Sequence, residues 1–223
     1  MAETVHVERR SDPRLFAGFG FVVVFLVGLV GSFALAKAGW PTPATPTQEV
    51  LEFFAVNSAA VAANAIGQGL AAIPLLAFTA GLARTFTGRP SAQLTAAGAV
   101  AAGTLLLSAA LVSTASVAAA TGDGNLVATV FYLAFLVGGP AHVVALSALL
   151  GTLAVAGRLS GRLPGWLTTL GLGFAGLGLL SVVNLAAPLV AITGPLIPLG
   201  RFGGLLFILL AVPALRRRAV VRT

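Results

Sequence analysis

The chain has 223 residues, of which 58% are hydrophobic and 9% charged, and its formal net charge is +7. A soluble domain is about half apolar and about a quarter charged, so this chain has too few polar side chains to cover a globule in water. Most of its surface must therefore contact lipid. The basic residues stand at the ends of apolar runs rather than on one face among aromatic residues, which argues against nucleic acid and indicates anionic membrane lipids as partners.

The scarcity of reactive side chains excludes several kinds of site. The chain has no cysteine and two histidines, His6 and His142, so disulfides and thiolate metal sites are excluded. A haem or zinc ion held by histidines within one chain is not expected either, and we predict neither a metal ion nor a cofactor. The only lysine, Lys37, ends the first apolar run, which excludes a retinal Schiff base in a late helix.

Six apolar runs predict an all-α, polytopic membrane bundle of six transmembrane helices. Each run is long enough for the roughly 20 residues that cross a ~30 Å hydrocarbon core. We assign residues 1–14 to a cytoplasmic tail, 15–215 to a single transmembrane domain and 216–223 to a basic cytoplasmic tail. The runs cover residues 15–36, 49–83, 91–120, 126–156, 164–188 and 192–215.

Two of these segments have irregular features. Residues 37–48 contain Trp40 and three prolines, so this connection cannot be a continuous helix and is predicted to lie at the membrane interface. The second run is longer than one span needs, and its start, with Glu49 and Glu52, is predicted to project into water. The fourth run is interrupted by Gly-Gly-Pro at residues 138–140.

The basic residues predict the orientation. Six alternating spans place eleven of the 13 basic residues on one side of the membrane and only Lys37 and Arg201 elsewhere. Because an excess of Lys and Arg marks the cytoplasmic side, both termini are predicted to be cytoplasmic. The eleven residues are Arg9, Arg10, Arg14, Arg84, Arg89, Arg158, Arg162, Arg216, Arg217, Arg218 and Arg222.

An internal repeat is visible in the middle of the chain. Residues 88–108 align without gaps on residues 161–181, at an offset of 73, with ten identities in 21 positions. A fixed offset of this kind indicates a duplication. It would put spans two and three in register with spans four and five as parallel hairpins, unlike the inverted repeats of many transporters.

Polar residues of several spans share one predicted depth. Counting 1.5 Å per residue from Arg216, Arg201 lies roughly 22 Å above the inner boundary, in the outer third of the hydrocarbon core. Similar counts bring the polar residues of three other spans to this height, and Asn57 shares a helical face with two of them. The predicted ligand-binding residues are Asn57, Asn64, Gln68, His142, Asn184 and Arg201.

Two interpretations of this polar layer remain open. It forms a pocket for the polar part of an amphiphilic or anionic molecule, or Arg201 snorkels to the interface while the amides hold helices together. A buried charge normally has a partner, and Glu52 is the predicted counter-ion of Arg201. The hydroxyl groups of span three, on Ser108, Ser113 and Thr114, are predicted to bond back to their own helix.

One segment carries a family resemblance. The sequence RLPGWL at residues 162–167 combines a basic loop with Pro, any residue and Trp-Leu at the start of the fifth run. This resembles a broad family of six-span membrane proteins of high-GC actinobacteria that is known as a domain of unknown function. The resemblance implies the six-helix layout over most of the chain and a bacterial plasma membrane. Members of that family often have an acidic residue where this chain has Arg201.

Three functions are compatible with these observations. The first is a non-enzymatic bundle that binds or carries a lipophilic or amphiphilic small molecule in an outer-leaflet polar pocket. The second is a membrane-embedded enzyme, such as a cyclase or isomerase acting on an isoprenoid-like substrate, with Glu52 as the candidate acid that protonates it. The third is a structural subunit of a larger membrane complex or oligomer. A Glu52 exposed to water would favour the first function over the second.

Overall fold

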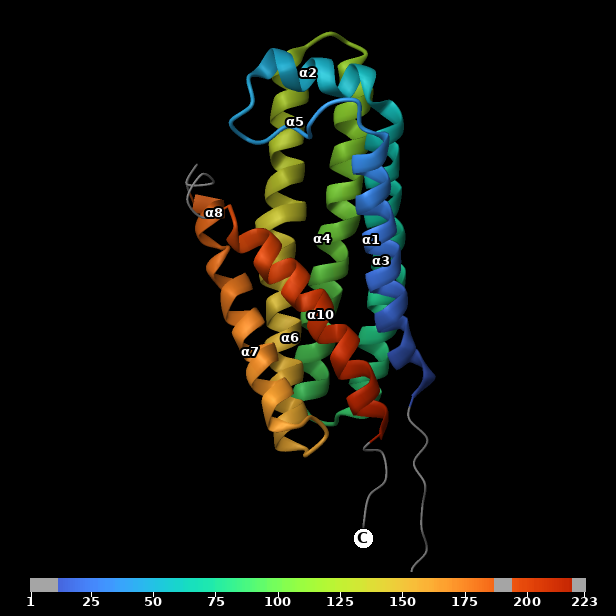
Figure 1. Ribbon diagram of the computed structural model, residues 1–223, viewed down its shortest axis with the longest axis vertical. Helices are drawn as coiled ribbons and strands as arrows, with labels where there is room; N and C mark the ends of the chain where they lie inside the picture. The colour runs from blue at the N-terminus through green and yellow to red at the C-terminus, as the bar shows by residue number, and fades with distance from the viewer. Residues whose placement is uncertain (1–11, 187–193, 218–223) are drawn as a thin grey trace, which may run out of the picture.

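Figure 1 shows the computed structural model of the protein, which describes residues 12–186 and 194–217. Within these two ranges all regular structure is helical. The elements in chain order are η1 (Pro13–Phe16), α1 (Ala17–Leu35), α2 (Thr47–Val56), α3 (Ser58–Thr85), α4 (Arg89–Ala119), α5 (Gly124–Leu136), η2 (Val137–Ala141), α6 (His142–Leu159), α7 (Gly165–Leu180), α8 (Val183–Ala186) and α10 (Leu196–Arg217).

Six helical segments in the described ranges are long and apolar enough to cross a membrane. They are η1 with α1, then α3, α4, α5 with η2 and α6, α7 with α8, and α10, and their mean hydropathies lie between 1.6 and 2.4. Large apolar side chains cover their outer surfaces, as Val23, Val27 and Val30 do on α1. Because such surfaces are stable only against lipid, the predicted all-α, six-helix membrane bundle is confirmed.

The second apolar run is divided at Asn57, which the sequence did not predict. The run begins as α2, which lies across one end of the bundle, and then turns into α3 (Figure 1). The side chain of Asn57 fixes this turn, because its Oδ1 accepts from the Lys37 N–H at 2.7 Å and its Nδ2 donates to the Phe53 carbonyl at 2.9 Å. Helix α2 buries Val50 and Phe53 and exposes its acidic residues.

The interruption predicted in the fourth run is a π-helical turn, η2, that joins α5 to α6 without breaking the span. Pro140 lies inside this turn. Proline lacks an amide hydrogen and clashes with the preceding turn of an α-helix, and a single wider turn accommodates it. Such turns are frequent at functional sites, and this one lies midway along the bundle (Figure 1).

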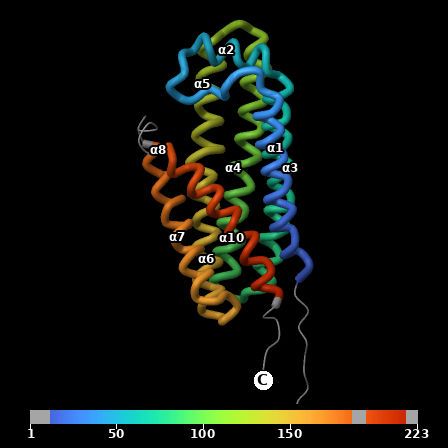
Figure 2. Tube along the Cα trace, in the orientation of Figure 1, coloured from blue at the N-terminus to red at the C-terminus, as the bar shows by residue number. Residues whose placement is uncertain are grey.

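The six spans close into a ring over only part of their length. Helix α1 packs on α3, α3 on α4, α4 on α5 and α6, and α6 on α7. Helix α10 starts beside α8 and crosses obliquely over the bundle to reach α1 (Figure 2), packing on α7, α6 and α1. It closes the ring near its own C-terminal end. Above the start of α10, α1 and α5 do not pack along each other, and α4 is seen between them in Figure 1.

The two ends of the bundle differ in charge. The first residues of α1, α4 and α7 and the last residues of α3, α6 and α10 lie at the same end, opposite α2 (Figure 1). We call these the arginine end and the α2 end. The arginine end carries Arg14, Arg84, Arg89, Arg158, Arg162 and Arg216. This grouping is the one that the predicted six-span topology requires.

Two glycines at the arginine end bear on the predicted repeat. Gly88, before α4, has φ of +68°, and Gly161, in the loop before α7, has φ of +67°. The two positions correspond to each other in the alignment of residues 88–108 with residues 161–181. Only glycine adopts this backbone conformation without strain. The match supports the duplication, which stays a prediction.

One pair of glycines sets the distance between α1 and α3. A Cβ atom on Gly28 would lie 2.5 Å from the Gly67 Cα, and one on Gly67 would lie 2.4 Å from the Gly28 Cα. The two backbones are therefore in direct contact, as small residues allow at helix crossings in membranes. Leu29 and Gln68, the next residues along each helix, line the cavity described below.

Candidate functional site

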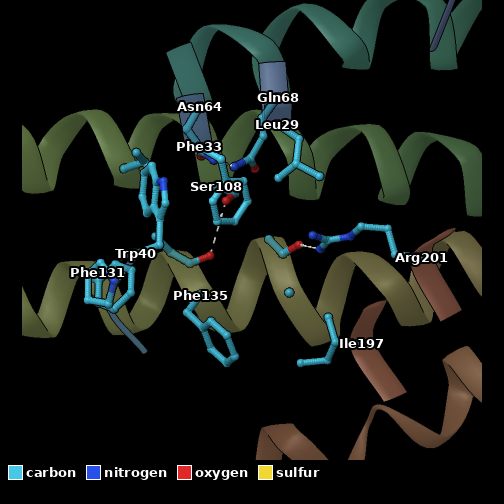
Figure 3. Close-up of a pocket in the computed structure, with 15 residues that line it drawn as sticks. Leu29, Phe33, Trp40, Asn64, Gln68, Ser108, Phe131, Phe135, Ile197 and Arg201 are labelled. Atoms are coloured by element: carbon cyan, nitrogen blue, oxygen red, sulfur yellow. Dashed lines mark hydrogen bonds between the residues drawn. The ribbon is translucent and has the colours of Figure 1, made fainter. Parts of the chain in front are cut away.

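A cavity of about 230 Å³ lies in the half of the bundle nearer α2. Figure 3 shows its lining, which comes from α1, α3, α4, α5, η2, α10 and the loop between α1 and α2. Most of the wall is apolar or aromatic, and Asn64, Gln68, Ser108 and Arg201 supply the polar groups. A smaller extension of about 40 Å³ is lined by Phe25, Leu29, Asn64, Gln68 and Arg201.

Helix α3 provides the amide wall of the cavity. Asn64 and Gln68 are four residues apart and therefore lie on the same face, and the Gln68 Nε2 donates to the Asn64 Oδ1 at 2.5 Å. Both side chains are half-buried. The Gln68 Oε1 is buried and has no hydrogen-bond partner, so one acceptor of this amide pair is unsatisfied.

Helix α10 places Arg201 against the opposite side of the cavity. Its guanidinium donates to the main-chain carbonyl of Gly138 in η2 and lies with its Cζ 5.5 Å from the centre of the Phe25 ring. The Nε atom is buried without a partner. No carboxylate of the described residues lies within ion-pair distance of Arg201, so its contacts are a carbonyl and an aromatic face and leave its charge uncompensated.

An aromatic cluster lies on the side of the cavity that is nearer the α2 end. The ring of Trp40 packs on Phe53 at 4.9 Å between centroids, Phe53 on Phe54 at 5.8 Å, and Phe54 on Phe131 at 5.6 Å. We call these four rings the aromatic lid. Trp40 and Phe131 also line the cavity, and the Trp40 Nε1 is buried without a partner. A tryptophan N–H normally finds an acceptor when it is buried.

The unpartnered polar atoms concentrate around this cavity. Five buried side-chain nitrogen or oxygen atoms lack a hydrogen bond in the described part of the chain, and three of them belong to residues of the cavity wall: the Trp40 Nε1, the Gln68 Oε1 and the Arg201 Nε. A buried polar group without a partner costs roughly 1–3 kcal/mol. Three such groups, from a loop and two helices, therefore belong to residues of one cavity wall, where a small side-chain movement would turn them toward the space.

Of the six predicted binding residues, the structure brings together Asn64, Gln68 and Arg201. The other three lie apart from the cavity wall. Asn57 is taken up by the turn between α2 and α3. The His142 Nδ1 lies 3.0 Å from the Ala101 carbonyl on α4, which makes this histidine a link between α4 and α6.

Asn184 likewise has a local role. Its Nδ2 donates to the Ser181 carbonyl at 3.1 Å, in the turn that follows α7. Equal depth along the membrane normal is therefore not sufficient for a shared site, because each helix also has a rotation about its own axis. Asn64 and Arg201 line the same space, whereas His142 bonds to α4 and Asn184 to the turn after α7.

Glu52 is not the partner of Arg201. It lies on the exposed face of α2, where its Oε1 accepts from the Gln48 Nε2 at 3.1 Å. The other acidic residues near this end are Glu49 and Asp123; both are exposed, and Asp123 caps the start of α5 through its bond to the Leu126 N–H. The cavity wall in the described ranges thus contains no carboxylic acid.

Three lining residues were missed by the sequence analysis as parts of a site. Trp40 was assigned to the interface, and Gly138 was read only as an interruption. Ser108 was expected to bond to its own helix, as Ser113 and Thr114 do, but its Oγ donates to the Ala134 carbonyl on α5 at 3.3 Å. Their roles arise from contacts between helices, which no local pattern encodes.

The fold and the cavity define an all-α, polytopic integral membrane protein with a mostly apolar chamber, carrying a few polar groups, in one half of its bundle. Comparison with known proteins adds no further assignment: no protein-family model, no curated protein and no solved structure matches this chain. The resemblance seen at residues 162–167 therefore stays a prediction.

Proposed function

We propose that the protein binds, and holds or carries, an amphiphilic small molecule whose polar part occupies the cavity between α3, η2 and α10. The observation that carries this proposal is that Trp40, Gln68 and Arg201, each with a buried polar atom that has no partner, line the same cavity. A pocket with a mostly apolar wall and a few convergent polar groups is the usual form of a small-molecule site.

The proposal includes an orientation. The arginine end lies in the cytoplasm and the α2 end outside, because the arginines of the described chain that flank the spans gather at one end, with only Lys37 of the described basic residues at the other. The cavity then belongs to the outer leaflet. The plasma membrane of a bacterium is the membrane that the resemblance implies, and both termini are cytoplasmic.

The two other functions find less support in the geometry. A cyclase or isomerase needs an acid beside its substrate, and Glu52, the candidate, is exposed on α2. A purely structural subunit would expose small residues without needing a chamber. Helix α7 does expose Gly173 and Gly176, so an oligomer or partner subunit is compatible with ligand binding, but the chamber itself favours the binding function.

The test replaces the two amide side chains of the cavity wall with apolar side chains of similar size. The protein and the double variant Asn64→Leu/Gln68→Leu are purified from the same membrane in mild detergent, and retained molecules are counted by native mass spectrometry. We expect the wild-type protein to retain an amphiphile and the variant to lose most of it. Ser113→Leu is the matched control, because Ser113 is an exposed residue that bonds to its own helix. Equal retention by all three proteins would contradict the proposed function.

A further inference from the structure

The geometry points to the class of ligand and to its route: we propose that the cavity takes the anionic head group of a membrane amphiphile, which reaches it sideways from the bilayer between α1 and α5. This inference rests on the proposed function and narrows it. Three features carry it: the contacts of Arg201, the size of the space beside Arg201, and the helices and rings that border the cavity.

The charge of the head group follows from Arg201. Its guanidinium contacts the Gly138 carbonyl and the Phe25 ring, and neither contact neutralises a cation. An ionised arginine held in a low-dielectric layer is costly unless a counter-charge accompanies it. No acidic side chain of the described residues supplies one, so the complementary ligand is an anion with acceptor oxygens, to which arginine donates strong, charge-assisted hydrogen bonds.

The volume limits the size of this group. The extension beside Arg201 measures about 40 Å³, which is about three times the ~10–15 Å³ that one water-sized probe occupies. A carboxylate or a phosphate monoester matches this space. The main cavity, at about 230 Å³, is smaller than the roughly 300–1,000 Å³ of sites that enclose a whole drug-sized ligand. The apolar part of a longer amphiphile must therefore extend outside.

The opening through which it extends lies between α1 and α5. Helix α1 packs along α3 and α5 along α4. Residues of α1, α5 and the start of α10 all line the cavity, so α1 and α5 flank it without packing along each other. Their rims carry Phe33, which is 59% exposed, and the half-buried Phe135. An alkyl or prenyl chain leaving the cavity here would lie in the hydrocarbon layer.

On the side toward α2 the cavity is bordered by the aromatic lid, and in this proposal that side is closed to water. The ring contacts of the lid run from Phe53 and Phe54 on α2 to Trp40 and Phe131 on the cavity wall. The loop that carries Trp40 is anchored by the bond from the Lys37 N–H to Asn57. Figure 3 places Trp40 and Arg201 on opposite sides of the cavity, with Gln68 and Ser108 between them.

The two tryptophans of the chain allow a direct test. Trp40 lines the cavity, whereas Trp166, at the start of α7, is 62% exposed at the arginine end. The variant Trp166→Phe, in nanodiscs of phosphatidylcholine at alkaline pH, is titrated with dibromostearate and with its uncharged methyl ester, since bromine quenches tryptophan fluorescence on contact. Trp40→Phe, which keeps only Trp166, reports quenching by the bulk bilayer.

We expect dibromostearate to quench Trp40 in a saturable way that unbrominated stearate reverses. The methyl ester should need at least a tenfold higher mole fraction than the acid for half-maximal quenching of Trp40. This is the difference expected for the loss of one charge-assisted hydrogen bond. Arg201→Gln in the Trp166→Phe background should abolish this difference between acid and ester. Arg201→Lys, which keeps the positive charge, should retain most of it. Thermal unfolding of both variants shows whether they remain folded.

The other outcomes separate the two proposals. Equal, saturable quenching by acid and ester would overturn the anionic head group and leave the binding function standing. Quenching of Trp40 that never saturates with either probe would overturn both. Displacement of dibromostearate by inorganic phosphate added to the aqueous phase would show that the anion comes from water, which overturns the route through the bilayer.

Discussion

Arg201 on α10 donates a hydrogen bond to the main-chain carbonyl of Gly138 in the π-helical turn. The two residues are 63 positions apart, and their contact ties the oblique last helix to the middle of the fourth span. The π turn and the arginine thus form one structural unit. This unit lines the part of the cavity wall formed by η2 and α10, to which Ile197 adds an apolar side chain.

The variant Gly138→Ala tests how closely this turn is packed. A Cβ atom at position 138 would lie 2.1 Å from the Ser108 Oγ and 3.3 Å from the Gln68 Oε1, so η2 and the Ser108 side chain of α4 would have to move apart. Overpacking of this kind costs about 1–3 kcal/mol, and we expect a lower melting temperature in detergent. Gly139→Ala is the matched control, because its Cβ would meet nothing closer than 3.9 Å.

Ser108 should be the cause of that clash. The double variant Gly138→Ala/Ser108→Ala removes the Oγ, which makes the nearest contact, and is expected to recover part of the lost melting temperature. An unchanged melting temperature in the single variant would mean that the turn and α4 are not in contact.

The variant Gly28→Ala tests the contact between α1 and α3. Its Cβ would lie 2.5 Å from the Gly67 Cα, and a backbone atom cannot move aside as a side chain can. We expect a loss of about 1–3 kcal/mol, measured as a shift in thermal unfolding of the purified protein. Gly31→Ala, one turn farther along α1 with open space around its Cβ, should unfold like the wild type. The idea fails if both variants behave alike.

The aromatic lid should keep water-borne reagents away from the cavity. The chain has no cysteine, so Ser108→Cys provides a single thiol on the cavity wall for a small, charged methanethiosulfonate reagent. We expect slow labelling in this variant and at least tenfold faster labelling when Phe53→Ala is added, because Phe53 joins Trp40 to Phe54. Val56→Ala, a change at an exposed residue of the same helix, should have no effect. Fast labelling of Ser108→Cys alone would show that the lid is open.

The orientation can be measured with two other single cysteines. Thr87→Cys lies exposed at the arginine end, and Asn125→Cys lies exposed at the α2 end. In intact cells, a membrane-impermeant maleimide should label position 125 at once and position 87 only after the membrane is permeabilised. The reverse pattern would place the termini outside the cell, and the cavity in the inner leaflet.

Part of the site could be predicted because depth in a membrane is a one-dimensional quantity. Arg201, Asn64 and Gln68 were placed at one height by counting residues from basic residues at the helix ends, and the structure brings them to one cavity. His142 and Asn184 were placed at the same height by the same count. They instead bond to the Ala101 and Ser181 carbonyls, because the rotation of a helix depends on which neighbours it packs against.

The sequence by itself determined the class of protein. The length of each apolar run, compared with the thickness of a bilayer, and the scarcity of charged residues can both be read from the local sequence. These two properties are sufficient to predict six apolar spans with basic residues grouped at one end. Only the tertiary structure decided where the chamber lies. Its existence depends on the oblique path of α10, on the fold-back of α2 at Asn57 and on the close approach of Gly138 to Ser108. Each of these is a contact between segments distant in sequence, whose free energy appears only when both segments are in place.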